Sequence, residues 1–137
     1  MKNYFIIIFT FFLFSCSSDD NKPDASELIG KWKLIEQLAD PGDGSGTFNP
    51  ITSKRTIEFF SNGAVIANGT LCYMSSEVGE ASSGTYLKVD GSDFSDGEIM
   101  SDSCEFDETK VYYKLEESNL ILWYQCIEGC GQKFIKN

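Results

Sequence analysis

Apolar and polar residues alternate in several short segments of the chain, which is the pattern of half-buried β-strands. In residues 28–35, Trp32 and Leu34 fall on one face, while Lys31 and Lys33 fall on the other. Segments of similar character follow at 52–60, 64–67, 84–89, 111–116, 120–124 and 133–136. The pattern predicts an all-β domain over residues 28–137, built from about eight short antiparallel strands.

Three local features refine this prediction. With strict alternation, Glu36 and Leu38 share the face of Trp32, and Gln37 lies on the opposite face. Residues 120–124 are apolar throughout, so this strand is expected to be central or covered on both faces. A lysine at each end of 133–136 is typical of an exposed sheet edge.

Glycines mark two important positions in the expected barrel. Ser61-Asn62-Gly63 predicts a tight hairpin, because Asn-Gly supplies the positive φ values that a two-residue turn needs. Gly30 lies two residues before Trp32 and allows tight entry of the chain. We therefore expect the Trp32 indole to plug one closed end of the barrel.

The first residues have a different character. Lys2 precedes an apolar run at 4–14 that is too short to cross a bilayer, which needs about 20 apolar residues, so residues 1–15 read as a signal peptide. The junction Leu-Phe-Ser-Cys at 13–16 resembles the lipobox of bacterial lipoproteins. That resemblance implies cleavage after residue 15 and acylation of Cys16, for example with palmitate. The alternative is an ordinary secretory leader that happens to be followed by cysteine.

Residues 16–27 are polar and lack an apolar period, as expected of a flexible tether. Within the tether, the Ser-Ser-Asp-Asp at 17–20 resembles the acidic export signals that send lipoproteins to the cell surface in one group of Gram-negative bacteria. A simple solvated linker is the alternative. We expect a domain anchored to the bacterial outer membrane by its N-terminal lipid, and exposed at the cell surface if this signal acts.

The chain is strongly acidic, with a formal net charge of −10, and it has no histidine. Nucleic acids and anionic membrane surfaces are recognised by basic residues, so we expect neither as a partner of the domain. Without histidine, a Ser–His or Cys–His catalytic pair is impossible, and the commonest metal ligand is missing. Carboxylates are plentiful, but no pair has a distinctive spacing. We therefore expect no catalytic residues, no metal and no cofactor.

Four cysteines follow the lipidation site: Cys72, Cys104, Cys126 and Cys130. An even number in an exported chain is typical of two disulfides, with three possible pairings. We favour Cys72–Cys104 and Cys126–Cys130, because the second pair closes a small loop whose glycine eases the turn. A four-cysteine zinc site is the alternative, although the spacings are irregular.

Four short motifs are shared with one family: Ile-Gly-Lys-Trp-Lys-Leu at 29–34, Phe-Phe-Ser-Asn-Gly at 59–63, Gly-Thr-Tyr at 84–86 and Lys-Phe-Ile at 133–135. On these motifs, residues 28–136 resemble the lipocalin-like domain lipoproteins of Gram-negative bacteria. The resemblance implies a small up-and-down barrel. In lipocalins an arginine near the last strand stacks on the first-strand tryptophan, a place that Lys133 or Lys136 would take here.

Two functions follow from such a barrel. The first is a binding protein that holds a small apolar or amphipathic ligand inside eight strands. Its wall residues would be Phe59, Tyr86, Tyr113, Leu122 and Trp123. The second is a non-catalytic interaction module whose barrel is filled by its own side chains and whose long loops, 39–51 and 74–83, contact an unknown protein partner.

Overall fold

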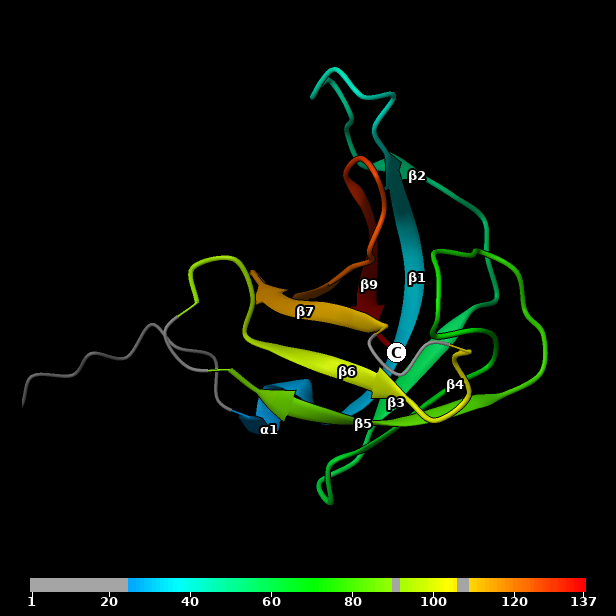
Figure 1. Ribbon diagram of the computed structural model, residues 1–137. Helices are drawn as coiled ribbons and strands as arrows, with labels where there is room; N and C mark the ends of the chain where they lie inside the picture. The colour runs from blue at the N-terminus through cyan, green and yellow to red at the C-terminus, as the bar shows by residue number, and fades with distance from the viewer. Residues whose placement is uncertain (1–24, 90–91, 106–108) are drawn as a thin grey trace, which may run out of the picture.

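The computed structural model describes residues 25–89, 92–105 and 109–137. The predicted leader, Cys16 and the tether up to residue 24 lie outside the described residues. The elements follow in the order α1 Ala25–Leu28, β1 Gly30–Ala39, β2 Asn49–Pro50, β3 Thr56–Phe59, β4 Ala64–Ala67, β5 Ser82–Lys88, β6 Gly97–Ser101, β7 Lys110–Glu116, β8 Asn119–Trp123 and β9 Cys130–Lys136 (Figure 1). Within these ranges, no helix is long and apolar enough to span a membrane.

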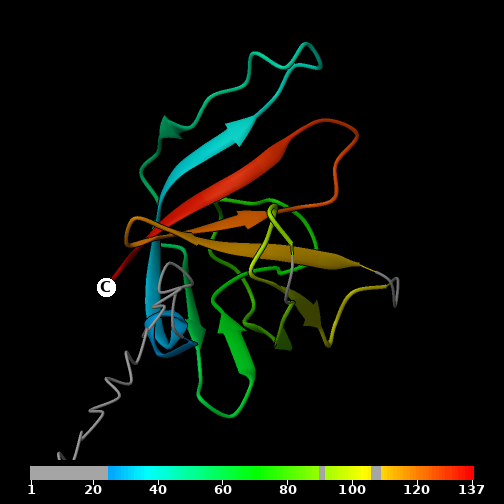
Figure 2. The same ribbon diagram turned by 90° about the vertical axis from the view of Figure 1, so that its left-hand side faces the viewer.

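The strands form one antiparallel sheet in the order β2-β1-β3-β4-β5-β6-β7-β8-β9. Because β1 also pairs with β9, the eight strands β1 and β3 to β9 close into an up-and-down barrel. The two-residue strand β2 pairs with the second half of β1, beyond the part that pairs with β3. Figure 2 shows β9 running between β1 and β8. The predicted all-β barrel is confirmed.

The β3–β4 hairpin shows how the local sequence directs a strand pair. Ile57 and Phe59 are buried at alternate positions of β3. Gly63 has a φ of +86°, as predicted, whereas Asn62 does not have a positive φ. The Phe60 N–H donates to the Ala64 carbonyl at 2.9 Å, so the hairpin is confirmed, but its loop has three residues, 61–63, and the prediction of a two-residue turn is wrong.

Some strand boundaries differ from the prediction, and two strands were not predicted: the two-residue β2, which lies in the expected loop 39–51, and β6. The first strand begins at Gly30 rather than at residue 28, because Leu28 ends α1 and packs into the core. Strand β3 covers only part of the expected segment 52–60. Strand β6 was missed because its acidic surroundings resemble a turn region. Ile99 is buried there, and a Cβ at Gly97 would collide with the neighbouring strand β5.

A bulge in β1 reverses the orientation expected for its second half. The register with β9 shifts between Leu34 and Glu36. Glu36 forms an ion pair with Lys133 at 2.7 Å, whereas Gln37 accepts a hydrogen bond from the fully buried Gln132 at 3.3 Å. One extra residue inverts the alternation that follows it. The prediction that Glu36 shares the face of Trp32, with Gln37 opposite, is therefore wrong.

The prediction that the last strand is an exposed edge is also wrong. Strand β9 pairs with β1 on one side and with β8 on the other. Its lysines have other roles: Lys133 binds Glu36, and the Lys136 ammonium lies 5.3 Å from the Trp32 ring centroid. Lys136 also donates to the Glu27 carbonyl at 2.7 Å, which ties the end of β9 to α1.

Trp32 lies buried where α1 meets the barrel. Its side chain is 2% exposed, and its indole Nε1 donates to the Leu28 carbonyl at 2.8 Å. Gly30 has a φ of +122°, and a Cβ at this position would lie 3.2 Å from Cε of Lys136. Glycine is favoured here by both the backbone conformation and the space under the lysine.

Both predicted disulfides are present. Cys72–Cys104 joins the β4–β5 connection to the β6–β7 connection, with Cα atoms 5.5 Å apart. Cys126–Cys130 joins the β8–β9 connection to the start of β9, with Cα atoms 6.2 Å apart. The four cysteines therefore form two covalent bridges, and the alternative of a four-cysteine zinc site is wrong.

Candidate binding surface

Three of the aromatic residues predicted to line a ligand site pack against one another within the barrel. The ring centroids lie 5.2 Å apart for Phe59 and Tyr86, 6.0 Å for Phe59 and Tyr113, and 6.2 Å for Tyr86 and Tyr113. All three pairs are edge to face, which is a favourable arrangement of aromatic quadrupoles. Burial raises the pKa of Tyr113 to about 12. The space between these rings is filled by the rings themselves.

A second buried group was not predicted from the sequence. It consists of Arg55, Tyr124 and Gln132, which are 1%, 7% and 0% exposed. The Tyr124 hydroxyl donates to the Gln132 amide oxygen at 2.7 Å, and the Gln132 amide nitrogen donates to the Ser75 carbonyl at 2.9 Å. The available signal was that Arg55 is the single arginine of the chain.

These polar side chains hold the β4–β5 connection, residues 68–81, against the barrel. Arg55 donates to the carbonyls of Thr70 and Glu77, and Leu71 between them is buried in the core. Among the described residues, no carboxylate lies within ion-pair distance of the Arg55 guanidinium. Burial raises the pKa of the neighbouring Tyr124 to about 12, although the Arg55 charge opposes this rise. The connection thus covers the interior at this point.

The other two residues predicted to line the ligand site lie on opposite faces of β8. Leu122 is fully buried in the core. Trp123 lies on the outer face, and its ring covers Gly131 of β9: a Cβ at Gly131 would come within 2.9 Å of the indole. This outward position explains why the predicted strand 120–124 is apolar on both faces.

Trp123 belongs to a group of aromatic residues, Phe48, Phe94, Tyr112 and Trp123, which we call the aromatic face. The Trp123 ring centroid lies 5.7 Å from that of Phe48 and 6.1 Å from that of Phe94, and Phe94 in turn lies 6.0 Å from Tyr112. Phe94 is 56% exposed. The four rings come from β7, β8 and the segments that precede β2 and β6, so the closed barrel brings them together.

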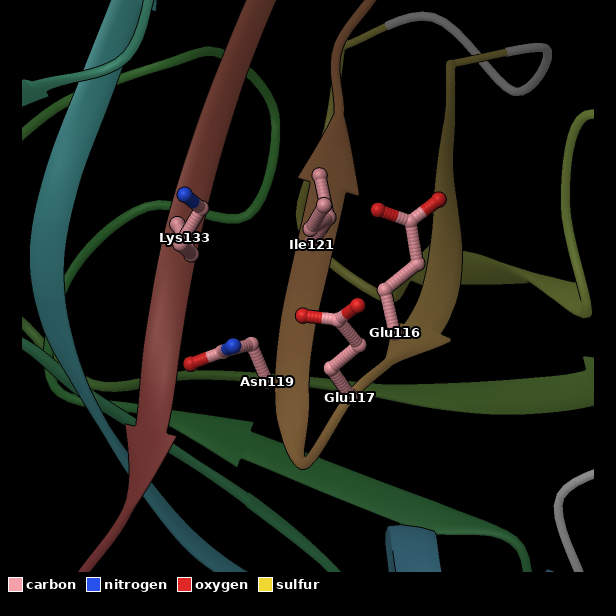
Figure 3. A pocket seen from close by; sticks show the side chains of 5 residues that line it. All are labelled: Glu116, Glu117, Asn119, Ile121 and Lys133. Atoms are coloured by element: carbon pink, nitrogen blue, oxygen red, sulfur yellow. The ribbon is translucent and has the colours of Figure 1, made fainter.

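A surface depression of about 420 Å³ lies beside the aromatic face, and we call it the β8 hollow. It is lined by Glu116, Glu117, Asn119, Ile121 and Lys133. Figure 3 shows these side chains on three adjacent strands and the turn between β7 and β8, with the two glutamates on one side of Ile121 and the lysine on the other. The hollow therefore combines an apolar residue with carboxylates, an amide and an ammonium group.

The lysines around the hollow already have acidic partners. Lys133 binds Glu36 at 2.7 Å, and Lys114 lies 3.5 Å from Glu116. For Glu117, the described part of the chain offers no ion-pair partner. Glu117 lies in the β7–β8 turn with a φ of +49°, a backbone conformation that residues other than glycine, asparagine and aspartate seldom adopt. This turn holds its carboxylate at the rim of the hollow.

The Lys133 ammonium connects the hollow to the aromatic face, because it lies 4.8 Å from the centroid of the Phe48 ring. Together the two features provide aromatic contact area, hydrogen-bond acceptors and the Glu117 carboxylate, which has no ion-pair partner among the described residues. Within the described ranges, no group of three or more Cys, Asp or Glu side chains is placed to hold a metal ion.

Comparisons with known proteins do not assign this chain to a family. No protein-family model, no curated protein and no solved structure matches the chain.

Proposed function

We propose that the protein is a non-catalytic binding module of the bacterial cell envelope, held at the outer membrane by a lipid on Cys16. In this proposal the barrel is filled by its own side chains, and recognition occurs on its outer surface. One observation carries the proposal: the aromatic residues inside the barrel contact one another, while Trp123 and Phe94 lie on the outside.

The interior supports the filled barrel over a barrel that holds a small apolar ligand. Phe59 and Tyr113 are 1% and 3% exposed, and each already contacts two aromatic neighbours. A barrel of eight strands has room for side chains or for one small ligand. A ligand in this region would have to displace the rings from contacts worth about 0.5–1.5 kcal/mol per pair.

The outer surface has the composition of a protein-recognition site. Tryptophan, tyrosine and phenylalanine are enriched at interfaces, and tryptophan and tyrosine dominate the binding energy there. Exposed aromatic groups of this kind on a soluble domain often mark interaction sites. The lipobox resemblance, the polar tether and the resemblance to lipocalin-like domain lipoproteins support attachment of such a module to the envelope.

The anchor can be tested independently of the binding surface. We expect a Cys16→Ala protein to be unacylated and to leave the membrane fraction, because the short apolar run of the leader cannot span a bilayer. Metabolic labelling with an alkyne fatty acid and membrane fractionation measure both effects. Acyl label on the variant, or detergent-sensitive membrane association, would contradict the lipid anchor at Cys16.

The site of recognition is tested with a photoreactive amino acid placed at Trp123 or at Ile66. Ile66 is a suitable control because it is 45% exposed on β4, which β5 and β6 separate from β7 of the aromatic face. We expect defined crosslinks in native envelopes from position 123 and none from position 66. Equal crosslinking from both positions would refute a specific outer surface. Saturable binding of a fluorescent fatty acid that perturbs Phe59 and Tyr113 would favour the ligand-holding barrel instead.

A further inference from the structure

We infer that the β8 hollow and the aromatic face form one binding site for an extended, cationic segment of a partner protein, with arginine or lysine at alternate positions. The inference rests on the proposed function, because it names the partner that the outer surface would recognise. It is carried by three properties of this surface: the spacing along β8, the arrangement of its charges and the position of its rings.

The spacing comes from the alternation of β8. Asn119, Ile121 and Trp123 lie on the outer face of the strand, where Ile121 is 5% exposed between its neighbours, whereas Leu120 and Leu122 are fully buried inside the barrel. Residues two apart in a strand are separated by roughly 6.8 Å. The hollow at Ile121 and the indole of Trp123 are therefore one such step apart. An extended partner segment presents alternate side chains at the same interval, so one could enter the hollow while the next covers the indole.

The charges of the surface favour a cation. The ammonium groups of Lys114 and Lys133 are paired with Glu116 and Glu36, at 3.5 Å and 2.7 Å. The carboxylate of Glu117 is left without an ion-pair partner among the described residues. The chain as a whole carries a formal net charge of −10, which attracts a basic segment and repels an acidic one.

The apolar groups suit the long side chains of basic residues. Lysine and arginine lay their aliphatic stems on apolar surface while the charged group stays in water, and the 56% exposed Phe94 beside Trp123 provides such a surface next to the hollow. Cations also bind over aromatic rings, best over tryptophan. The structure already contains one such contact on this surface, because the Lys133 ammonium lies 4.8 Å from the Phe48 ring centroid. The larger Trp123 ring lies beside it.

The experiment uses the two tryptophans of the chain as internal reporters. The full acylated chain, in a neutral detergent, is titrated with three octapeptides that alternate leucine with arginine, with citrulline or with glutamate. The indole N–H signals are followed by NMR. We expect the arginine peptide to shift the Trp123 signal in a saturable manner, and to leave the signal of Trp32, which is 2% exposed, unchanged.

Two charge-matched variants separate the site from general attraction. Glu117→Gln removes the Glu117 carboxylate from the β8 hollow, and Glu80→Gln removes one carboxylate from a separate hollow beside the Cys72–Cys104 bridge. We expect Glu117→Gln to weaken arginine-peptide binding by up to roughly fivefold, as for a partly exposed ion pair. Glu80→Gln should have no effect beyond that of the lost net charge. Trp123→Ala removes the reporter signal, so its binding is measured by isothermal titration calorimetry beside the parent protein, and it should be weaker by about thirtyfold, as for a residue at the centre of an interface.

The remaining outcomes distinguish this inference from the proposed function. Equal binding of the arginine and citrulline peptides at Trp123 would refute the cationic partner and leave the outer surface as a recognition site for neutral groups, glycans included. Equal losses for the two glutamate variants would refute the role of the hollow. Absence of any Trp123 shift would also overturn the inference. A fatty-acid probe that shifts only interior signals would overturn the proposed function as well.

Discussion

Truncation of Trp32 tests the closed end of the barrel. The indole is 2% exposed, and burial of an aromatic side chain removes roughly 150–250 Å² from water. At about 25 cal/mol per Å², this burial contributes about 4–6 kcal/mol, close to the 3–5 kcal/mol typical of large-to-alanine substitutions. The Leu28 carbonyl, which accepts the indole N–H at 2.8 Å, would also lose its partner. We expect Trp32→Ala to lower the free energy of unfolding by about 4 kcal/mol.

Urea unfolding followed by circular dichroism measures this effect, provided that the slope with denaturant is unchanged. Trp123→Ala is the matched control, and we expect it to cost less than about 1 kcal/mol because the ring lies on the outer face. Trp32→Phe keeps an aromatic ring but not the hydrogen bond, so it should fall between the two. If Trp32→Ala is too unstable to purify, the phenylalanine variant carries the comparison. A loss below about 1 kcal/mol for Trp32→Ala would refute the buried plug.

Three further predictions concern stability. Replacing Cys72 and Cys104 with alanine should lower the free energy of unfolding by about 3.7 kcal/mol, by the chain-entropy relation for a separation of 32 residues. For the Cys126–Cys130 bridge, with a separation of 4 residues, the same relation gives about 1.9 kcal/mol, and equal losses in urea unfolding would contradict this account. Ser118→Gly should stabilise the protein by up to about 1 kcal/mol, because Ser118 has a φ of +79°, and a lower urea midpoint would show that the turn is not strained. Folding raises the pKa of Tyr124 from about 10 to about 12, so the contribution of this residue to the free energy of unfolding should be fully present below pH 10 and should be lost between pH 10 and 12. Urea unfolding at each pH measures this loss, which should be smaller for Tyr124→Phe.

The sequence alone was sufficient for the features that depend on neighbouring residues. Alternation over a few residues placed most strands, since a strand that buries one face must alternate whatever it pairs with. Asn-Gly specified the hairpin at Gly63 through its backbone conformation. The cysteine count, together with the small loop between Cys126 and Cys130, led to the correct pairing among three possibilities.

Other features depend on which strands meet, and only the tertiary structure determined them. The last strand carries lysines like an edge, yet closure against β1 makes it internal and gives Lys136 a place over Trp32. A single bulge in β1 inverted the faces of Glu36 and Gln37, a change that strict alternation cannot anticipate. Arg55 is the clearest case, because its partners are backbone carbonyls far away in the sequence.

The candidate site shows the same division. An apolar stretch at 120–124 indicated that both faces of this strand make contacts, but not which residue would face outward. Closure of the barrel buried Leu122 and left Trp123 outside, beside Phe48 and Phe94, which are distant in sequence. A binding surface that spans several strands depends on pairing and twist across the whole sheet, and a pattern along one strand does not contain that information.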